Sequence, residues 1–343
     1  MVSGERFLLG PCSAESREQV IETAQALRDV CGFPFIFRAG VWKPRTSPHT
    51  FQGAGEAGLE WLAEVKRTFG IPVATEVATP EHVEAAMKAG IDYVWIGART
   101  SANPLAVQAI CERISGLVVS GLGASGVFIK NPVNADAELW LGNIERIEKA
   151  VYGVGCKVYA IHRGCGHKPC WSMAHKVRLA RPDIPMLLDP SHMSGDAAQV
   201  PELIKKIEEL GLDGAMIEVH NKPAEALSDA KQQISPADLT AALLDRFTVR
   251  PASPVRSETE LNWLRAEIDE LDDTLWETIA ARMDVSRRIG AWKKAHGVAP
   301  LQPERYRIIG ERLAVSGERL GLSKTFIDHI WELIHEESLR QQV

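Results

Sequence analysis

IPVATEVATPEHVEAAMKAGIDYVWIGAR, residues 71–99, is the stretch that decides the fold, because it holds one full repeat of a pattern that fills most of the chain. Its apolar runs at Ile71–Val77 and Tyr93–Ile96 are typical of buried β-strands. The segment between them, Pro80–Lys88, has the apolar spacing of an amphipathic helix. A strand, a helix and a second strand in this order predict a parallel βαβ unit.

The same unit repeats on both sides of this stretch, up to residue 247. Eight apolar runs are typical of strands: Phe7–Leu9, Phe35–Phe37, Ile71–Val77, Tyr93–Ile96, Gly126–Ile129, Val158–Ile161, Met186–Leu188 and Ala215–Val219. Amphipathic helical segments accompany them, among them Arg17–Val30, Glu56–Phe69, Pro80–Lys88, Pro201–Leu210 and Ile234–Leu244. Eight repeats favour an α/β fold of the closed (β/α)8 TIM-barrel type over an open doubly wound sheet. The glycines after the first run do not form a dinucleotide-binding fingerprint either.

Polar residues follow every predicted strand. In chain order they are Gly10–Cys12, Arg38, Thr75–Glu76, Gly97–Arg99, Lys130–Asn131, His162–Arg163, Asp189–His192, and Glu218 with His220. The active site of a (β/α)8 barrel lies at the C-terminal ends of its strands, where these residues would meet at one rim. We therefore expect the active site at this rim.

Four of the polar residues are typical metal ligands. They are Cys12, His192, Glu218 and the later Asp229. A thiolate, an imidazole and two carboxylates suit one borderline divalent ion of the Mn, Fe, Co or Zn class better than Ca or Mg. The set comes from the first, seventh and eighth repeats, which adjoin when a barrel closes. Taken alone, Cys12 could equally be a buried inert thiol.

A second group is cationic and suits anions. Arg38, Arg99, Lys130 and Arg163 come from four different strand ends. The loop RAGVWKPRTSPHTFQG at residues 38–53 adds Lys43, Arg45, Thr46 and Ser47. Its two neighbouring prolines lower the entropy of ordering such a loop. Cations and hydroxyls in this density are typical of a phosphate site, although a short basic loop can also be solvated surface.

Composition excludes several classes of partner and location. The chain has 343 residues and a net charge of −6, which disfavours nucleic acid and anionic membranes as partners. No signal peptide or long apolar segment is present, and six scattered cysteines are typical of reduced thiols. We expect a cytoplasmic protein.

Cys165, His167 and Cys170 resemble a metal-ligand spacing but lack a paired second half, so their role stays open.

The last third of the chain changes character. Residues 248–257, TVRPASPVRS, have the composition of a linker. From residue 258 to 296 the chain lacks proline, and apolar residues recur at three- and four-residue steps, which predicts one long helix. Two shorter helices are expected at Pro303–Ser316 and Lys324–Gln342. Three helices cannot cover so long an apolar stripe, so we expect an intertwined homodimer through this all-α module, with a higher oligomer left open.

Cationic residues also mark this module. Arg282 and Lys293 are eleven residues apart, which places them on one helical face, whereas Arg265 points toward a neighbouring helix. Cations within an apolar seam indicate an anionic ligand. The alternative is that the helices only dimerise or regulate the barrel.

Residues 7–247 resemble the 3-deoxy-D-arabino-heptulosonate 7-phosphate (DAHP) synthases. The resemblance is carried by GPCSAES at 10–16, residues 38–53, TEV at 75–77, IGAR at 96–99, HRG at 162–164, DPSH at 189–192, MIEVH at 216–220 and SDAKQ at 228–232. The 3-deoxy-D-manno-octulosonate 8-phosphate synthases are similar to these enzymes but are expected to carry Ala-Asn in place of Pro44-Arg45. This pair favours DAHP synthase.

The resemblance implies a function for each rim residue. Arg38, Lys43, Arg99, Lys130 and Arg163 would bind phosphoenolpyruvate, and Arg45, Thr46 and Ser47 would bind the phosphate of erythrose 4-phosphate. Cys12, His192, Glu218 and Asp229 would hold the metal, which acts as a Lewis acid on the aldehyde. Lys43 and Cys12 are the expected catalytic residues, and Lys43 is the candidate for proton handling near the aldehyde.

Residues 258–343 resemble the all-helical chorismate mutases. The resemblance is carried by LRAEIDELD at 264–272, AAR at 280–282, GAWK at 290–293 and PERY at 303–306. It implies a substrate site for chorismate and prephenate without a metal, made of Arg265 from the partner subunit, Arg282, Lys293, Arg305, Ser338 and Gln342. Arg282, Lys293 and Gln342 are the expected catalytic residues. Tyr306 and Gln302 stand where this family commonly has Glu and Asp, which puts the efficiency of the mutase in question.

The two resemblances together predict a bifunctional enzyme of aromatic amino acid biosynthesis in the shikimate pathway. The expected domains are a synthase barrel at 1–247, a linker at 248–257 and a mutase domain at 258–343. A synthase and a later enzyme on one chain suggest feedback, so we expect prephenate to inhibit the barrel through the helical domain. Two alternatives are a non-catalytic helical module and an octulosonate-type barrel.

Overall fold

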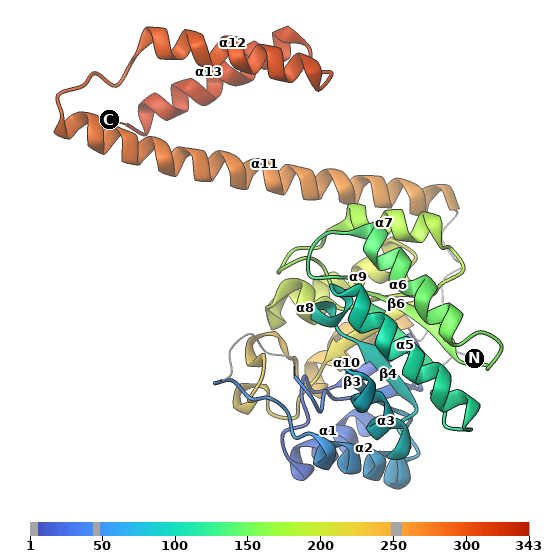
Figure 1. Ribbon diagram of the computed structural model, residues 1–343. Helices are drawn as coiled ribbons and strands as arrows, with labels where there is room; N and C mark the ends of the chain where they lie inside the picture. Colours follow the sequence, from blue (N-terminus) through green and yellow to red (C-terminus); the bar gives the residue numbers. More distant parts are fainter. Residues whose placement is uncertain (1–5, 44–48, 248–255, 343) are drawn as a thin grey trace. The chain divides into compact units, whose positions relative to one another are not determined.

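A computed structural model describes residues 6–43, 49–247 and 256–342. Its first part is a closed barrel in which eight parallel strands pair in chain order and β8 returns to β1 (Figure 1). The strands are β1 Phe7–Gly10, β2 Ile36–Arg38, β3 Val73–Val77, β4 Tyr93–Ile96, β5 Gly126–Lys130, β6 Lys157–His162, β7 Met186–Leu188 and β8 Gly214–Glu218. The predicted (β/α)8 barrel is confirmed. Strand β3 begins two residues later than expected, after Pro72, which has no N–H to donate to a ladder.

Helices alternate with the strands and cover the barrel. They are α1 Arg17–Val30, α2 Glu56–Phe69, α3 Pro80–Lys88, α4 Ala98–Ser101, α5 Pro104–Val119, α6 Ala137–Ala150, α7 Trp171–Ala180, α8 Pro190–Ser194, α9 Val200–Glu209 and α10 Pro236–Phe247. Short 3-10 turns lie at η2 Ala197–Gln199, η3 Pro223–Glu225 and η4 Ala230–Gln232. Side-chain caps define several starts: Ser16 accepts from the Gln19 N–H before α1, and Thr79 accepts from the His82 N–H before α3.

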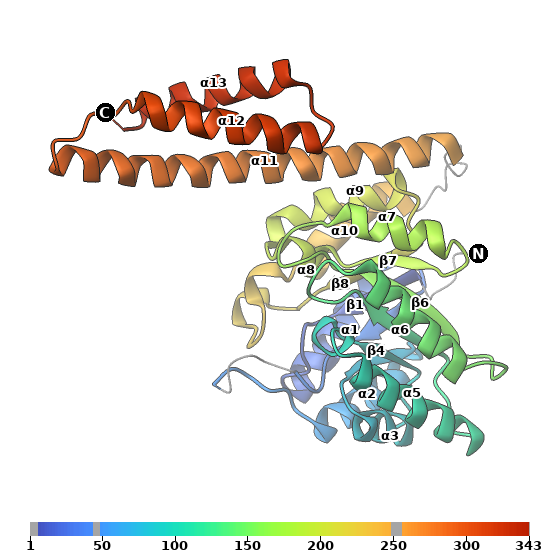
Figure 2. The same cartoon turned by 45° about the horizontal axis from the view of Figure 1, so that its top comes forward.

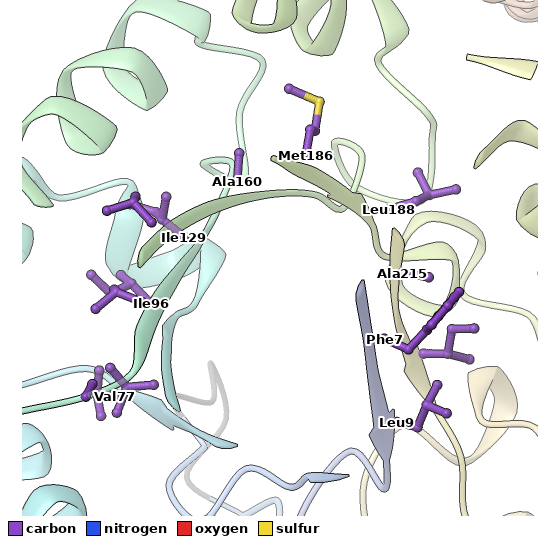
Figure 3. Close-up of a cluster of buried hydrophobic side chains, with 14 of the residues drawn as sticks. Phe7, Leu9, Val77, Ile96, Ile129, Ala160, Met186, Leu188 and Ala215 are labelled. Atoms are coloured by element: carbon purple, nitrogen blue, oxygen red, sulfur yellow. The ribbon is translucent and has the colours of Figure 1, made fainter. Parts of the chain in front are cut away.

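Two apolar layers follow from the alternation of side chains along each strand. In β1, Phe7 and Leu9 face outward to the helices, whereas Leu8 faces into the barrel. Figure 3 shows the outer layer, with side chains such as Val77 and Ile129 set around the outside of the ring of strands. The inner layer is Leu8, Ile36, Ala74, Tyr93, Trp95, Phe128, Tyr159, Ile161, Leu187 and Met216. This filled interior leaves the rim as the place for a site.

The chain divides into two compact units, Met1–Glu267 and Ile268–Val343. The division falls inside the long helix α11, Arg256–Ala295. Trp263, near the start of α11, is only 2% exposed and donates from Nε1 to the Leu210 carbonyl at 3.0 Å. Its ring stacks on His175 of α7, with centroids 5.2 Å apart and planes 7° apart. The first turns of α11 therefore belong to the apolar packing of the barrel unit. The predicted linker at 248–257 lies mostly outside the described residues, and its last two residues begin α11.

The second unit is helical, as predicted. It contains the rest of α11, then α12, Pro303–Arg319, and α13, Lys324–Arg340, which pack against each other as an antiparallel pair (Figure 2). Ile327 and Trp331 of α13 are buried. Many other apolar side chains of the unit are exposed, including Leu275 at 54% and Trp276 at 67%. Within the described chain, none of the helices combines the length and apolar character that crossing a membrane requires.

Candidate active sites

The structure brings together three of the four predicted metal ligands. The ligand atoms of Cys12, Glu218 and Asp229 all lie within 4.8 Å of one another. Among the described residues this is the one group of three or more such side chains that could hold a metal ion. The fourth predicted ligand, His192, has its Nε2 atom 3.6 Å from Glu218 Oε1. A thiol, two carboxylates and an imidazole in this space fit a borderline divalent ion.

The backbone conformation of Asp229 and the hydrogen bonds of His192 and Cys12 support the same interpretation. Asp229 has a φ of 50°, in the left-handed region, and strain of this kind is concentrated at functional sites. The buried Asp189 carboxylate lies 2.9 Å from His192 Nδ1, which orients the opposite ring nitrogen toward Glu218. Burial, with the charge of Glu218, raises the pKa of Cys12 to about 12, and its thiol donates to Asp229 Oδ2 at 3.0 Å. A bound metal would replace that proton.

The predicted phosphoenolpyruvate residues line one cavity beside this cluster. Its volume is about 520 Å³, and all five of them, Arg38, Lys43, Arg99, Lys130 and Arg163, lie in its wall. Arg38 is 1% exposed, and its NH1 atom donates to Glu218 Oε1 at 2.9 Å. Its buried Nε has no hydrogen-bond partner among the described residues. A buried guanidinium in the wall of a cavity lined by four further cations fits an anionic ligand.

Buried carboxylates balance the cations of the barrel site. Lys130 Nζ lies 2.6 Å from Asp189 Oδ2. Burial alone would raise the pKa of Asp189, but His192 and Lys130 hold it well below its ordinary value. Burial would also raise the pKa of Glu218, but the positive charges of His192 and Arg38 outweigh this effect and hold that pKa below its ordinary value. Both carboxylates are therefore charged at neutral pH, and the site is preorganised rather than purely cationic.

Lys43 lines the cavity and also contacts the metal cluster. Its Nζ donates to the Cys12 carbonyl at 2.9 Å and lies 3.9 Å from Glu76 Oε2. The preceding Trp42 stacks on His82 of α3, with ring centroids 4.0 Å apart, which fixes the backbone before Lys43. The predicted erythrose 4-phosphate residues Arg45, Thr46 and Ser47 lie outside the described residues.

Sequence reasoning did not assign roles to several residues of this site. Asp189 was seen only as part of a polar strand end, and Gln232, whose Nε2 donates to Glu218 Oε2 at 2.7 Å, was missed. Glu76, Asn134 and His167 also line the cavity. A carboxylate three residues before a candidate histidine ligand was the available signal for Asp189. Cys165 and Cys170 lie outside the one candidate metal group among the described residues.

The helical unit has a cationic site of its own. The Arg282 guanidinium donates to the Ser338 hydroxyl and lies over the Trp331 ring, 5.7 Å from its centroid. Lys293 is 9% exposed, and its Nζ donates to Gln342 Oε1 at 3.0 Å and to the Pro300 carbonyl at 2.6 Å. Four of the predicted chorismate residues, Arg282, Lys293, Ser338 and Gln342, thus join α11 to the C-terminal end of the chain.

The other two predicted chorismate residues are placed differently. Arg305 is exposed on α12. Arg265 is also exposed, in the part of α11 that belongs to the barrel unit, and its NH1 donates to Asn262 Oδ1 at 3.4 Å. Its assignment to the site of a partner subunit stays a prediction.

Comparison with known proteins identifies both parts. Residues 3–246 match the model of the DAHP synthetase I family. The chain belongs to the DAHP synthetase I family. Residues 264–343 match chorismate mutase type II, so this DAHP synthetase I chain carries the expected fusion.

The DAHP synthetase I barrel has relatives with two names. A phospho-2-dehydro-3-deoxyheptonate aldolase of Thermotoga maritima is 31% identical over 237 residues, which cover 66% of this chain but only 64% of the relative. A 2-dehydro-3-deoxyphosphooctonate aldolase of Azoarcus sp. strain BH72 is 32% identical over 238 residues, covering 65% of this chain and 82% of that protein. The crystal structure of the Thermotoga aldolase, called DAHP synthase, matches with a TM-score of 0.59 and 29% identity, over 70% of this chain and 67% of that one.

Proposed function

We propose that the barrel condenses phosphoenolpyruvate with erythrose 4-phosphate and water to give DAHP and phosphate. The observation that carries this proposal is the buried Arg38, which lies in the wall of the cavity beside the Cys12–Glu218–Asp229 cluster. Phosphoenolpyruvate carries a phosphate and a carboxylate, and both need cations in a site shielded from water. Arg99, Lys130 and Arg163 supply further charges in the same cavity wall.

The residues of the chain would share the chemistry as follows. Arg38 and Lys130 orient the enol acid, and their charges stabilise the negative charge that develops in the transition state. A divalent ion held by Cys12, His192, Glu218 and Asp229 would supply Lewis acidity at the aldehyde oxygen. Lys43, which lies beside the cluster, holds or moves a proton near that oxygen, because its ammonium is buried and close to Glu76.

The sugar phosphate is the finer part of the proposal, since relatives of both types are similar to this chain. The octulosonate product has one carbon more than the heptulosonate, so its aldose substrate has five carbons rather than four. In the sequence, Arg45 follows Pro44 and adds a cation that suits the phosphate of the shorter sugar. This pair supports erythrose 4-phosphate.

One assay tests the barrel proposal. Protein reconstituted separately with Mn, Fe, Co or Zn is mixed with phosphoenolpyruvate and either erythrose 4-phosphate or arabinose 5-phosphate, and phosphate release is measured. We expect turnover with the four-carbon sugar and much less with the five-carbon sugar. Preference for arabinose 5-phosphate would instead assign the octulosonate reaction.

We also infer a second function, the rearrangement of chorismate to prephenate, in the helical unit. Arg282 and Lys293 donate to neutral oxygens of Ser338, Gln342 and Pro300, and within residues 256–342 neither pairs with a carboxylate, which leaves their charge for an anionic ligand. Chorismate has two carboxylates, and Lys293 with Gln342 can donate to its ether oxygen as that C–O bond breaks. The decrease in chorismate absorbance with time measures this activity. If the protein does not convert chorismate, the helical unit is instead a module for dimerisation or regulation.

A homodimer and feedback complete the proposal. The exposed apolar side chains of α11, such as Leu275 and Trp276, are the surface that a second copy would cover.

Prephenate bound to the helices would then inhibit the barrel. Deletion of the helical unit tests this, and the deletion should begin after Glu267, because Trp263 packs in the barrel unit. Inhibition that survives the deletion would refute the feedback.

A further inference from the structure

One face of α13 carries the polar groups of the mutase site. Trp331, His335 and Ser338 follow one another at four- and three-residue steps, which places them within roughly 60° around the helix. Ser338 accepts from Arg282, and Gln342, just beyond the end of α13, accepts from Lys293. His335 therefore lies at one edge of the face that meets the two cations of α11, between Trp331 and Ser338 along the helix.

One ring nitrogen of His335, the buried Nε2 atom, has no hydrogen-bond partner among the described residues. Trp331 Nε1 is also buried without a partner there, but it faces Gly310 of α12, where an added Cβ would lie 3.2 Å away. The indole N–H thus points into packed helix, and His335 is the better candidate for a ligand contact.

The imidazole is held in place and kept neutral. The Tyr306 ring packs on it with centroids 4.4 Å apart, and the Trp331 ring lies 5.5 Å away. Burial, with the positive charges of Arg282 and Lys293, lowers the pKa of His335. A neutral imidazole has one donor and one acceptor nitrogen, which suits a hydroxyl better than a carboxylate.

One polar group of chorismate has no binding residue among the cations of this site. The two carboxylates of chorismate suit Arg282 and the other arginines, and its ether oxygen suits Lys293 with Gln342. The remaining group is the hydroxyl of the ring. We propose that His335 binds this ring hydroxyl and that Tyr306 fixes the plane of the imidazole, an assignment that rests on the proposed mutase function.

The test compares two substrates, chorismate and its analogue without the ring hydroxyl, on the full-length protein. For the wild type we expect kcat/KM to be at least about tenfold higher for chorismate, since a lost hydrogen bond in a buried site costs about this factor. In His335→Phe this preference should disappear, because the substitution lowers kcat/KM for chorismate and leaves kcat/KM for the analogue unchanged. Tyr306→Phe keeps the stacked ring and is expected to keep the preference.

Each other outcome has a definite meaning. A wild type that converts both compounds equally, or a His335→Phe protein that keeps the preference, overturns the assignment. Loss of the preference in Tyr306→Phe moves the hydroxyl contact to Tyr306 and also overturns it. If His335→Phe does not fold, His335→Gln, whose amide can still accept and donate, should keep part of the preference. A wild type that converts neither compound contradicts the mutase function itself, whereas the barrel assay reports that the protein is intact.

Discussion

The barrel site and the helical site handle charge in opposite ways. In the barrel, cations pair with buried carboxylates of the same unit: Arg38 with Glu218 at 2.9 Å and Lys130 with Asp189 at 2.6 Å. In the helical unit, Arg282 and Lys293 are held by a hydroxyl, an amide and a backbone carbonyl. The barrel charges are therefore arranged before a substrate arrives, whereas in the helical unit the proposed anionic ligand would neutralise the cations.

The two units also differ in how they cover apolar surface. Strands surrounded by helices bury both layers of the barrel, so Phe7 and Leu8 are fully buried on opposite faces of one strand. Three helices have no such cover, and Leu271, Leu275 and Trp276 of α11 remain 67%, 54% and 67% exposed. This difference supports the proposal that a second copy of the chain covers the exposed face of α11.

Metal removal should separate the two activities most strongly. Chelation followed by desalting is expected to lower synthase turnover by at least about a thousandfold, because Lewis acidity contributes several kcal/mol, and to leave mutase turnover unchanged. Adding back a divalent ion should restore the synthase. Equal loss of both activities would contradict the location of the metal cluster in the barrel.

Lys43→Met is expected to lower synthase turnover by about a few hundredfold, since it removes the proton carrier while keeping the length of the side chain. Lys88→Met, at a lysine with a 63% exposed side chain on α3, is the matched control. Steady-state kinetics with both substrates gives the measurement. Near-normal turnover in Lys43→Met would remove Lys43 from the chemistry.

Leu275→Glu should disrupt the proposed dimer and lower mutase activity by about a hundredfold, because a charge at the centre of an apolar interface is costly. Synthase activity should stay within about twofold. Light scattering reports the mass, and Leu179→Glu on α7, where the leucine is 66% exposed, serves as the control. A Leu275→Glu protein that keeps its mass and mutase activity would show that this face of α11 is not the interface.

The smallest effect is an acid destabilisation of the barrel through His162. Burial lowers its pKa to about 3, whereas the unfolded chain has an ordinary value near 6.5. Below about pH 6.5 the unfolded chain takes up a proton that the folded chain does not, so stability falls as the pH drops toward 3. Between pH 7 and 5 the loss should be about 2 kcal/mol.

His162→Phe isolates this contribution. The aromatic ring still packs between Trp140 and Trp171, whose centroids lie 6.2 and 5.3 Å from the imidazole. Urea midpoints at pH 7 and pH 5 are compared for the two proteins. A slope as steep in His162→Phe as in the wild type would assign the acid loss to other groups that titrate in this range, such as His82, whose pKa burial also lowers.

Much of the fold was predictable from local pattern. Apolar runs locate the strands because a barrel strand is buried on both faces, and the predicted Tyr93–Ile96 and Met186–Leu188 agree with the observed bounds. Ends of elements were less predictable where backbone chemistry decides them, as at Pro72. The long helix was predicted from its periodicity, but its division between two units at Glu267 was not, because the burial of Trp263 depends on distant α7 and α9.

The sequence by itself determined the order of strands and helices, the rim on which the polar residues lie, and the types of ligand that those residues suit. These follow from periodicity and from the side-chain chemistry at each strand end. Only the tertiary structure decided which charges are paired, that Asp189 supports both Lys130 and His192, and that His335 has an unused nitrogen beside Arg282. Such properties depend on burial and on distances between residues far apart in the chain, which no local pattern contains.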